Sequence, residues 1–208
     1  MSTRLPDAYF DQLYSGGDDP WQLSTRWYEQ RKYSITLALL PNRHYRHAFE
    51  PGCSIGTLTA LLAQRCAHVT AVDVADAALR SADARLSDAG CRARVTLGRS
   101  SVDAAWPTGP FDLLVLSEVA YYLDADNLAQ VLHRECVRLL PGANVVAAHW
   151  RHPVADYPLS GDAAHEIIAA TPGLTAVGRY RDRDVVIEVF DTGDGRSVAA
   201  REDVPGAR

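Results

Sequence analysis

The sequence has little of several features that mark common functional classes. It holds a single lysine, Lys32, against 20 arginines, and its formal net charge at pH 7 is −5. Nucleic-acid binding normally requires a basic surface, so nucleic acid is not an expected partner. No apolar run is as long as a membrane span, and residues 1–7 lack the apolar core of a signal peptide. We therefore expect no membrane partner.

The chain also lacks the cysteine patterns of metal sites and of disulfide frameworks. Its four cysteines show no C-x-x-C pair and no zinc-ligand spacing, and their neighbours are apolar: Cys53, Cys66, Cys91 and Cys136. This pattern favours buried, reduced thiols in a cytoplasmic protein and predicts no metal site.

Length and composition indicate one soluble globular domain. The 208 residues suffice for one α/β core and are too few for two ordinary domains, with 47% hydrophobic and 23% charged residues. We expect a single domain over residues 1–191, with an N-terminal lid helix in about residues 1–40. Residues 192–208 are rich in glycine and charge, without an apolar pattern, and predict a disordered tail.

Helical and extended patterns alternate along the chain. The unbroken apolar run 111–117 is typical of a central strand covered on both faces. The order favours a doubly wound, Rossmann-like α/β fold with helices on both faces and a C-terminal antiparallel hairpin. The other expected helices are 22–40, 56–65, 75–86, 128–139 and 161–171, and the other expected strands end near Phe49 or span 68–72, 94–97, 144–150, 174–181 and 184–191.

A small-residue loop follows the first strand, and an acid ends the second. The loop is the segment 50–56, and Asp73 follows about 20 residues later, as in nucleoside sites of doubly wound sheets. The dinucleotide fingerprint would need glycines where the chain has Ser54 and Thr57. A carboxylate at Glu50 would repel a pyrophosphate but suits a ligand with an amine and a sulfonium. This combination indicates S-adenosylmethionine as the cofactor.

Several ordered motifs extend this indication over residues 8–191. They are Tyr9-Phe10-x-x-Leu13-Tyr14, Asp19-Pro20-Trp21, Trp27-Tyr28-Glu29-x-Arg31-Lys32-Tyr33, Glu50-Pro51-Gly52-Cys53-Ser54-Ile55-Gly56, Ser117-Glu118-Val119-x-Tyr121-Tyr122-Leu123, and His149-Trp150 followed by Asp156-Tyr157-Pro158-Leu159-Ser160-Gly161-Asp162. With them the chain resembles class I S-adenosylmethionine-dependent methyltransferases, and among these the nodulation S-type N-methyltransferases. The resemblance implies a seven-stranded methyltransferase sheet and N-methylation of a small-molecule amine. It suggests an amino sugar, the free amine of a de-N-acetylated chitooligosaccharide.

Residues at the expected strand ends are the candidates for cofactor binding. Asp73 would accept both ribose hydroxyls, or alternatively cap the next helix, and Glu50 would hold the ammonium group or cap its loop. Ser101 with the backbone of Val102 would bind adenine, ahead of Asp103 as a weaker candidate. The full expected set is Tyr28, Arg31, Glu50, Gly52, Ser54, Gly56, Asp73, Val74, Ser101, Val102 and Ser117.

The aromatic and basic residues near position 30 have two interpretations. In the first, the segment lids the cofactor, with Arg31 on its carboxylate and an aromatic face on its sulfonium. In the second, the helix only docks on the sheet, its aromatics fill the core and its cations are solvated. Trp27 fits either interpretation, whereas Trp21 is expected to be structural.

An amine acceptor needs a free lone pair, so a proton acceptor or a desolvated pocket is expected beside it. Glu118 and His149, each at a strand end, are the candidates, and His149 could instead be a hydrogen-bonded structural residue. The acceptor side is expected to include Tyr121, Tyr122, Trp150, Asp156 and Tyr157.

Other functions share parts of this pattern. An O-methyltransferase acting on a small molecule and a non-catalytic nucleoside-binding protein remain alternatives. A nicotinamide-dependent oxidoreductase is disfavoured by Glu50 and by the missing third glycine. The sequence does not indicate an oligomeric state.

Overall fold

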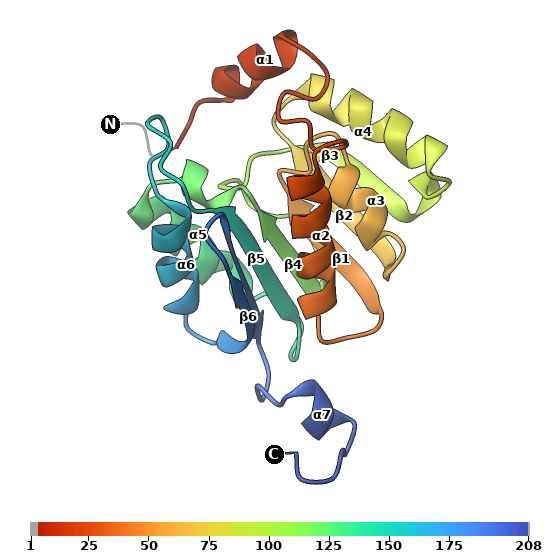
Figure 1. Cartoon of the computed structure of the whole chain (residues 1–208), viewed down its shortest axis with the longest axis vertical. Coiled ribbons are helices and arrows are strands. Elements are labelled where there is room, and N and C mark those ends of the chain that lie inside the picture. Colours follow the sequence, from red (N-terminus) through yellow and green to blue (C-terminus); the bar gives the residue numbers. More distant parts are fainter. Residues whose placement is uncertain (1–3, 208) are drawn as a thin grey trace.

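Seven strands form one sheet in the order β3-β2-β1-β4-β5-β7-β6 (Figure 1). The computed structural model describes residues 4–207. The strands are β1 (Tyr45–Pro51), β2 (Cys66–Asp73), β3 (Val95–Arg99), β4 (Leu113–Ser117), β5 (Asn144–Trp150), β6 (Thr175–Arg181) and β7 (Val185–Asp191). The helices are α1 (Asp7–Ser15), α2 (Trp27–Leu39), α3 (Thr57–Leu62), α4 (Asp76–Asp88), α5 (Ala125–Cys136), α6 (Gly161–Ala169) and α7 (Val198–Arg201), with short 3-10 turns η1 (Arg92–Arg94) and η2 (Ala120–Tyr122).

Strand directions confirm the expected doubly wound sheet. Strands β3, β2, β1, β4 and β5 run parallel, and β7 joins β5 and β6 in antiparallel pairs. The chain order reverses between β1 and β4, which is where such sheets place their ligands, beyond the carboxyl ends of the strands. The C-terminal hairpin predicted from the sequence is formed by β6 and β7.

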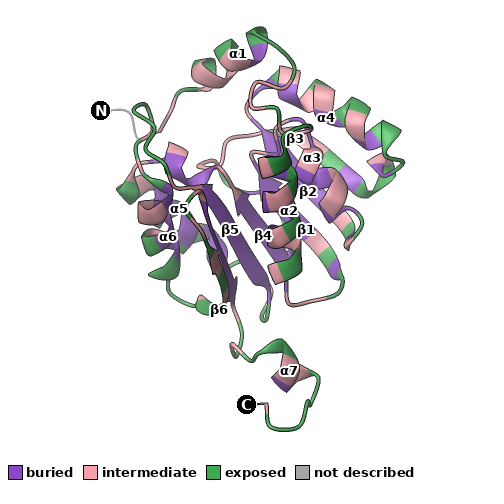
Figure 2. Cartoon of the chain, in the orientation of Figure 1, coloured by how far each residue is buried: buried purple, intermediate pink, exposed green. Residues whose placement is uncertain are grey.

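Strand β4 shows why the sheet lies at the centre of the molecule. Leu113 and Val115 pack into a core with side chains of α2, α3 and α4, whereas Leu114 and Leu116 pack into a second core with α5 and α6. Both faces of the central strands are therefore buried between helices, as the colouring in Figure 2 shows. This confirms the expectation from the unbroken apolar run.

The N-terminal segment differs most from the expected elements. Residues 7–15 form α1, which is not among the helices expected from the sequence, and α2 begins at Trp27 rather than at residue 22. Phe10 and Tyr14 lie one turn apart on α1 and pack with Ile55 and Ala78, which explains the helix. Residues 1–3 of the expected lid segment lie outside the described residues.

The tail also differs from its expectation. Ser197 caps α7 by accepting from the Ala200 backbone N–H at 3.1 Å. The buried Asp191 carboxylate accepts from Arg201 and from the backbone N–H of Gly193 at 2.7 Å. These bonds connect the segment to the end of β7, and the expected disorder of the tail stays a prediction. Arg208 lies outside the described residues. Within residues 4–207, no helix is long and apolar enough to cross a membrane.

Candidate active site

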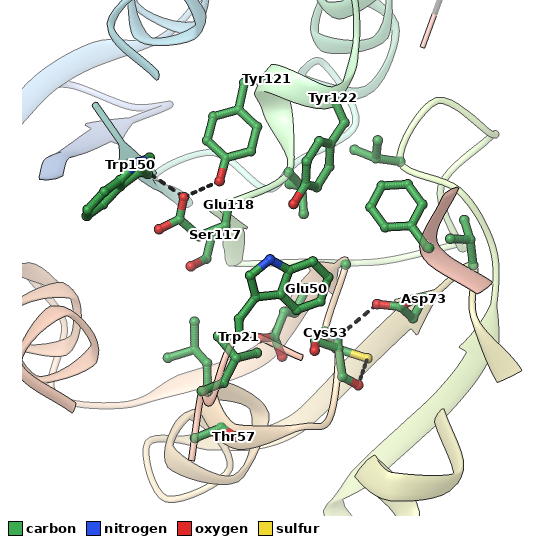
Figure 3. A pocket seen from close by; sticks show the side chains of 18 of the residues that line it. Trp21, Glu50, Cys53, Thr57, Asp73, Ser117, Glu118, Tyr121, Tyr122 and Trp150 are labelled. Atoms are coloured by element: carbon green, nitrogen blue, oxygen red, sulfur yellow. Dashed lines mark hydrogen bonds between the residues drawn. The ribbon is translucent and has the colours of Figure 1, made fainter. Parts of the chain in front are cut away.

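A cavity of about 570 Å³ opens at the carboxyl ends of the strands. Its walls come from the residues that follow β1, β2, β3, β4 and β5, and from α1, α2 and the segment between them. Figure 3 shows side chains of these elements converging on one space. Of the expected site residues, the cavity brings together Tyr28, Glu50, Gly52, Ser54, Asp73, Val74, Ser101, Val102, Ser117, Glu118, Tyr121, Tyr122, Trp150 and Tyr157.

The loop after β1 turns tightly against β2. The backbone N–H groups of Gly52 and Cys53 both donate to the Val72 carbonyl, at 2.7 and 3.0 Å. Gly52 has φ +73°, and a Cβ there would lie 2.2 Å from Cγ1 of Val119, so only glycine fits. Gly56 has a different role: it lies outside the cavity lining and packs closely against Ala82 of α4. The sequence predicts both ligand approach and tight helix packing for this glycine, and the structure shows the packing.

Asp73 lies at the cavity wall and also organises the backbone around it (Figure 3). One carboxylate oxygen accepts from the Ser54 N–H at 2.8 Å and the other from the Ala75 N–H at 3.0 Å. Burial raises the pKa of Asp73, while these N–H donors act in the opposite direction. The geometry thus combines the two expectations for this residue, a carboxylate facing a ligand and a bond to the chain entering α4.

Glu50 lines the cavity with a carboxyl oxygen that has no hydrogen-bond partner among the described residues. The residue is buried at the end of β1, and the unpartnered oxygen is its Oε2. Burial raises its pKa to about 8. The buried hydroxyls of Thr57 and Tyr28, which also line the cavity, are likewise unpartnered within residues 4–207. Such atoms cost free energy unless a ligand or water bonds to them. An acid and two hydroxyls without partners in one cavity suit a polar ligand that carries an ammonium group.

Glu118 is fixed in the cavity wall directly after β4. Its φ of +57° is unusual for a residue with a side chain, and its backbone N–H donates to the Ala148 carbonyl at 2.9 Å. Its Oε2 accepts from the Tyr121 hydroxyl at 2.5 Å and from the Trp150 N–H at 2.9 Å (Figure 3). The carboxylate is therefore held in one orientation beside the aromatic residues.

Lys32, which only the docking interpretation places in solvent, is 1% exposed and lines the cavity. Its Nζ lies 2.6 Å from Oε1 of Glu118 and 2.7 Å from Oε2 of Glu29. The two carboxylates outweigh the cost of burial and raise the pKa of Lys32. Sequence reasoning missed both Lys32 and Glu29 as site residues. The spacing of Glu29 and Lys32, one helical turn, indicated a pair but not its burial.

The N-terminal segment covers part of the cavity. The Tyr14 hydroxyl lies 2.5 Å from Oγ of Ser54, and the rings of Phe10 and Tyr122 meet edge to face with centroids 4.9 Å apart. Trp21 was expected to be structural; it contacts Tyr14 edge to face and also lines the cavity. The sequence signal for these contacts was the spacing of two aromatic residues, Phe10 and Tyr14, which lie one helical turn apart.

Arg31 lies outside the cavity, so its expected contact with a cofactor carboxylate is corrected. Its guanidinium donates to Asp182 at 2.8 Å and to the Tyr180 hydroxyl, tying α2 to the C-terminal hairpin. Arg26, just before α2, lines the cavity instead. Trp27 is 73% exposed and is not among the lining residues.

His149 is buried behind the cavity wall, and the expectation of a catalytic base is corrected. Its Nε2 accepts from the Ala120 backbone N–H at 3.1 Å, and its Nδ1 bonds Nε2 of His165 at 3.0 Å. Nδ1 of His165 then bonds Glu188 at 2.6 Å. Burial, His165 and Lys32 hold the pKa of His149 well below its usual value. The structure thus favours the alternative, a neutral structural histidine.

Two further expectations concern the edges of the site. Asp156 is exposed and lies outside the lining, whereas its neighbour Tyr157 is part of it; the expectation for Asp156 is corrected. At the other edge, Ser101 and Val102 line the cavity, while Asp103 is bonded to Ser101 and paired with a guanidinium nitrogen of Arg4 at 3.1 Å. Within residues 4–207, no group of three or more His, Cys, Asp or Glu side chains is arranged to hold a metal ion.

Curated proteins are similar in sequence to part of this chain. A nodulation protein S of Bradyrhizobium diazoefficiens is 34% identical over 107 residues, 51% of this chain and 50% of that protein. One of Sinorhizobium fredii is 30% identical over 131 residues, 62% of this chain and 59% of that protein. The chain thus matches only about half of the length of these curated relatives.

Solved structures share the fold. The crystal structure of the N-methyltransferase NodS from Bradyrhizobium japonicum WM9 in complex with S-adenosyl-L-homocysteine has a TM-score of 0.78 and 23% identity, over 89% of this chain and 97% of that chain. The family model for nodulation protein S (NodS) matches residues 12–152, more than half of the chain. The protein therefore belongs to the nodulation protein S (NodS) family.

Proposed function

We propose that the protein is an S-adenosylmethionine-dependent methyltransferase that methylates the amine of a small molecule. The observation that carries this proposal is Glu50, a buried carboxylate with an unpartnered oxygen in the loop where dinucleotide enzymes hold phosphate. This acid offers a pyrophosphate no positive charge, whereas the ammonium end of adenosylmethionine, bound beside it, would hold it as a carboxylate. Family membership and the shared fold support the same cofactor.

The lining residues provide a place for each part of the cofactor. Asp73 would accept the ribose hydroxyls, and Ser101 with Val102 would bind the adenine edge. Glu50 would accept from the ammonium group. Arg26, which lines the cavity whereas Arg31 does not, would pair with the carboxylate. When bound, adenosylmethionine supplies an electrophilic methyl group.

The acceptor side of the cavity combines aromatic rings with a fixed carboxylate. Tyr121, Tyr122 and Tyr157 pack against one another with centroids 4.8–4.9 Å apart, and Trp150 lies at the other side of Glu118. Glu118 would accept a hydrogen bond from the acceptor's nitrogen and orient its lone pair toward the methyl group. Aromatic faces and an acid suit an amino sugar, and we propose this class of acceptor.

The domain organisation is part of the proposal. Residues 1–191 would act as one methyltransferase domain in which the segment up to about residue 40 lids the cavity. Contacts of Tyr14 with Ser54 and of Phe10 with Tyr122 support the lid. All four cysteines are buried and free of disulfides, which supports the proposed cytoplasmic location.

Calorimetry tests the proposed cofactor directly. The protein should bind S-adenosylhomocysteine and should not bind NADH at the same concentration, because Glu50 disfavours phosphate. In the Glu50→Lys variant, which replaces the acid by a cation, binding of S-adenosylhomocysteine should be lost. Binding of NADH without binding of S-adenosylhomocysteine would refute the methyltransferase function.

A further inference from the structure

Three charged groups form a buried cluster at the acceptor side of the cavity. The Lys32 ammonium lies between the carboxylates of Glu29 and Glu118, at 2.7 and 2.6 Å. Lys32 and Glu29 are both buried on α2, and Glu118 follows β4. The ammonium also lies 5.3 Å from the ring centroids of Tyr28 and Tyr33. The chain has no other lysine.

The cluster is not electrically balanced. Two carboxylates and one ammonium leave one negative charge in a largely buried place, and buried charges are normally paired. Burial raises the pKa of Glu29, while the adjacent Lys32 acts in the opposite direction. Of the two carboxylates, Glu118 is the more exposed, at 22% against 9%, so we assign the unbalanced charge to it. The Oε1 of Glu118 is bonded only by Lys32 among the described side chains and faces the cavity.

The groups around the cluster do not supply the missing cation. It is faced by Tyr28 and Tyr33 on α2, Tyr121 on η2, Glu50 on β1, His149 on β5, and Asp182 and Asp184 in the hairpin link. Burial raises the pKa of each of the three tyrosines and lowers that of His149. These side chains are therefore neutral near pH 7, and the others are acids.

We propose that Lys32 and Glu29 are positioning residues that hold Glu118 as an oriented carboxylate with one free negative charge, which binds the acceptor's ammonium group. This inference rests on the proposed amine methylation. The bound ammonium has no lone pair, so one of its protons must pass to the Glu118 carboxylate, and from there to solvent, before the nitrogen takes the methyl group. Tyr121 and the Trp150 N–H fix the second oxygen, so an incoming N–H finds Oε1 at a defined place.

The single lysine permits a direct test of the cluster in solution. An untagged chain grown with ¹³Cε-labelled lysine gives one side-chain NMR signal, that of Lys32. With S-adenosylhomocysteine bound, this signal should stay at its charged position beyond the pH at which an exposed lysine titrates. A signal that titrates as in an exposed lysine would show that the cluster is absent and would overturn the proposal.

Charge-compensating variants test the role of the cluster in acceptor binding. Glu29→Gln makes the cluster neutral, and Lys32→Met leaves two facing carboxylates that share a proton. Each should lower kcat/KM for the amine accepted by the wild-type protein by about 10- to 100-fold, as for loss of a charged hydrogen bond. Lys32→Met should also move the pH at half-maximal rate upward. The double variant restores one negative charge on Glu118 and should recover part of the loss.

Three results contradict the proposal: additive losses in the double variant, a loss in Lys32→Met that is equal at every pH, or unchanged kinetics in Glu29→Gln. The affinity for S-adenosylhomocysteine should stay constant in all variants. This measurement serves as the control for correct folding. If Glu29→Gln weakens S-adenosylmethionine binding but not S-adenosylhomocysteine binding, the charge serves the sulfonium and the proposal fails. A wild-type protein that methylates no amine refutes the proposed function instead, and the NMR titration still tests the cluster.

Discussion

The backbone N–H of Ser54 donates to a carboxylate oxygen of Asp73 at 2.8 Å and so ties the loop after β1 to the end of β2. The second oxygen of Asp73 accepts from the Ala75 N–H at 3.0 Å. The loop and the acid are therefore arranged before any ligand enters. Such preorganisation lowers the cost of ordering the site on binding, but it also gives Asp73 a role in stability.

Substitutions of Asp73 should separate these two roles. Asp73→Asn keeps one oxygen for the backbone and loses the charge, so S-adenosylhomocysteine affinity should fall about 10- to 100-fold with a small change in Tm. Asp73→Ala leaves the N–H groups of Ser54 and Ala75 without their acceptor, so Tm should fall as well. Calorimetry and thermal unfolding measure both effects. Unchanged affinity in both variants would show that Asp73 does not contact the ribose.

Glu50 should couple cofactor binding to pH. Its pKa of about 8 means that the free protein holds a proton there at neutral pH, and an ammonium group bound beside it favours the carboxylate. Binding of S-adenosylhomocysteine near pH 7 should therefore release close to one proton. Calorimetry in two buffers of different ionisation enthalpy measures this release. An equal dependence of the binding heat on the buffer's ionisation enthalpy in wild type and Glu50→Gln would contradict the coupling.

The raised pKa of Glu50 also predicts the pH dependence of stability. Between the usual glutamate value of 4.5 and about 8, the folded protein binds more protons at Glu50 than the unfolded chain. The stability contribution of Glu50 is thus fully present below the lower value and is lost as pH rises through the upper one. The Tm of the unliganded wild type should fall relative to Glu50→Gln as pH increases across this window. A constant difference would contradict the burial of an ionisable Glu50.

The two arginines near the start of α2 should behave differently. Arg26→Ala removes a guanidinium from the cavity lining and should weaken S-adenosylhomocysteine binding by about 10-fold or more. Arg31→Ala breaks only the contacts with Asp182 and Tyr180, so affinity should stay within about twofold while Tm falls slightly. The reverse order of affinities would mean that the lid closes differently when the cofactor binds.

Glu118 and His149 can be ranked by single-turnover rates with a confirmed amine acceptor. Glu118→Gln removes the charge beside the acceptor, and we expect a loss of about 10²-fold, the low end for a positioned proton acceptor. His149→Asn breaks the buried chain to His165 and should mainly lower Tm, with a smaller loss of rate. A fully active Glu118→Gln together with an inactive His149→Asn would overturn this ranking.

The parts of the site that the sequence predicted are those fixed by short-range spacing. The glycine loop and Asp73 follow buried strands at a defined separation, and the apolar run 111–117 could only be central. Side chains alternate along β5, so Trp150 lines the cavity while its neighbour His149 faces α6. The residue type and strand end alone did not indicate which of the two points to the ligand.

The errors near α2 have a related cause. The helix begins at Trp27 rather than at residue 22, and a helix turns by about 100° per residue. The face presented to the cavity therefore could not be derived from composition, and Arg31 was chosen over Arg26. Lysine side chains are rarely buried, so the sequence pattern alone does not predict the buried position of Lys32. Its burial depends on Glu118, 86 residues away in sequence.

The central claim, amine methylation with S-adenosylmethionine, is tested most directly by transfer of a tritiated methyl group to matched acceptors. We predict transfer to a chitooligosaccharide or other amino sugar with one free amine, no transfer to its fully N-acetylated counterpart or to phenols, and a strong reduction with Glu118→Gln. Transfer to a hydroxyl acceptor in preference to every amine of the panel, or no transfer to any acceptor while S-adenosylhomocysteine binds, would contradict the claim.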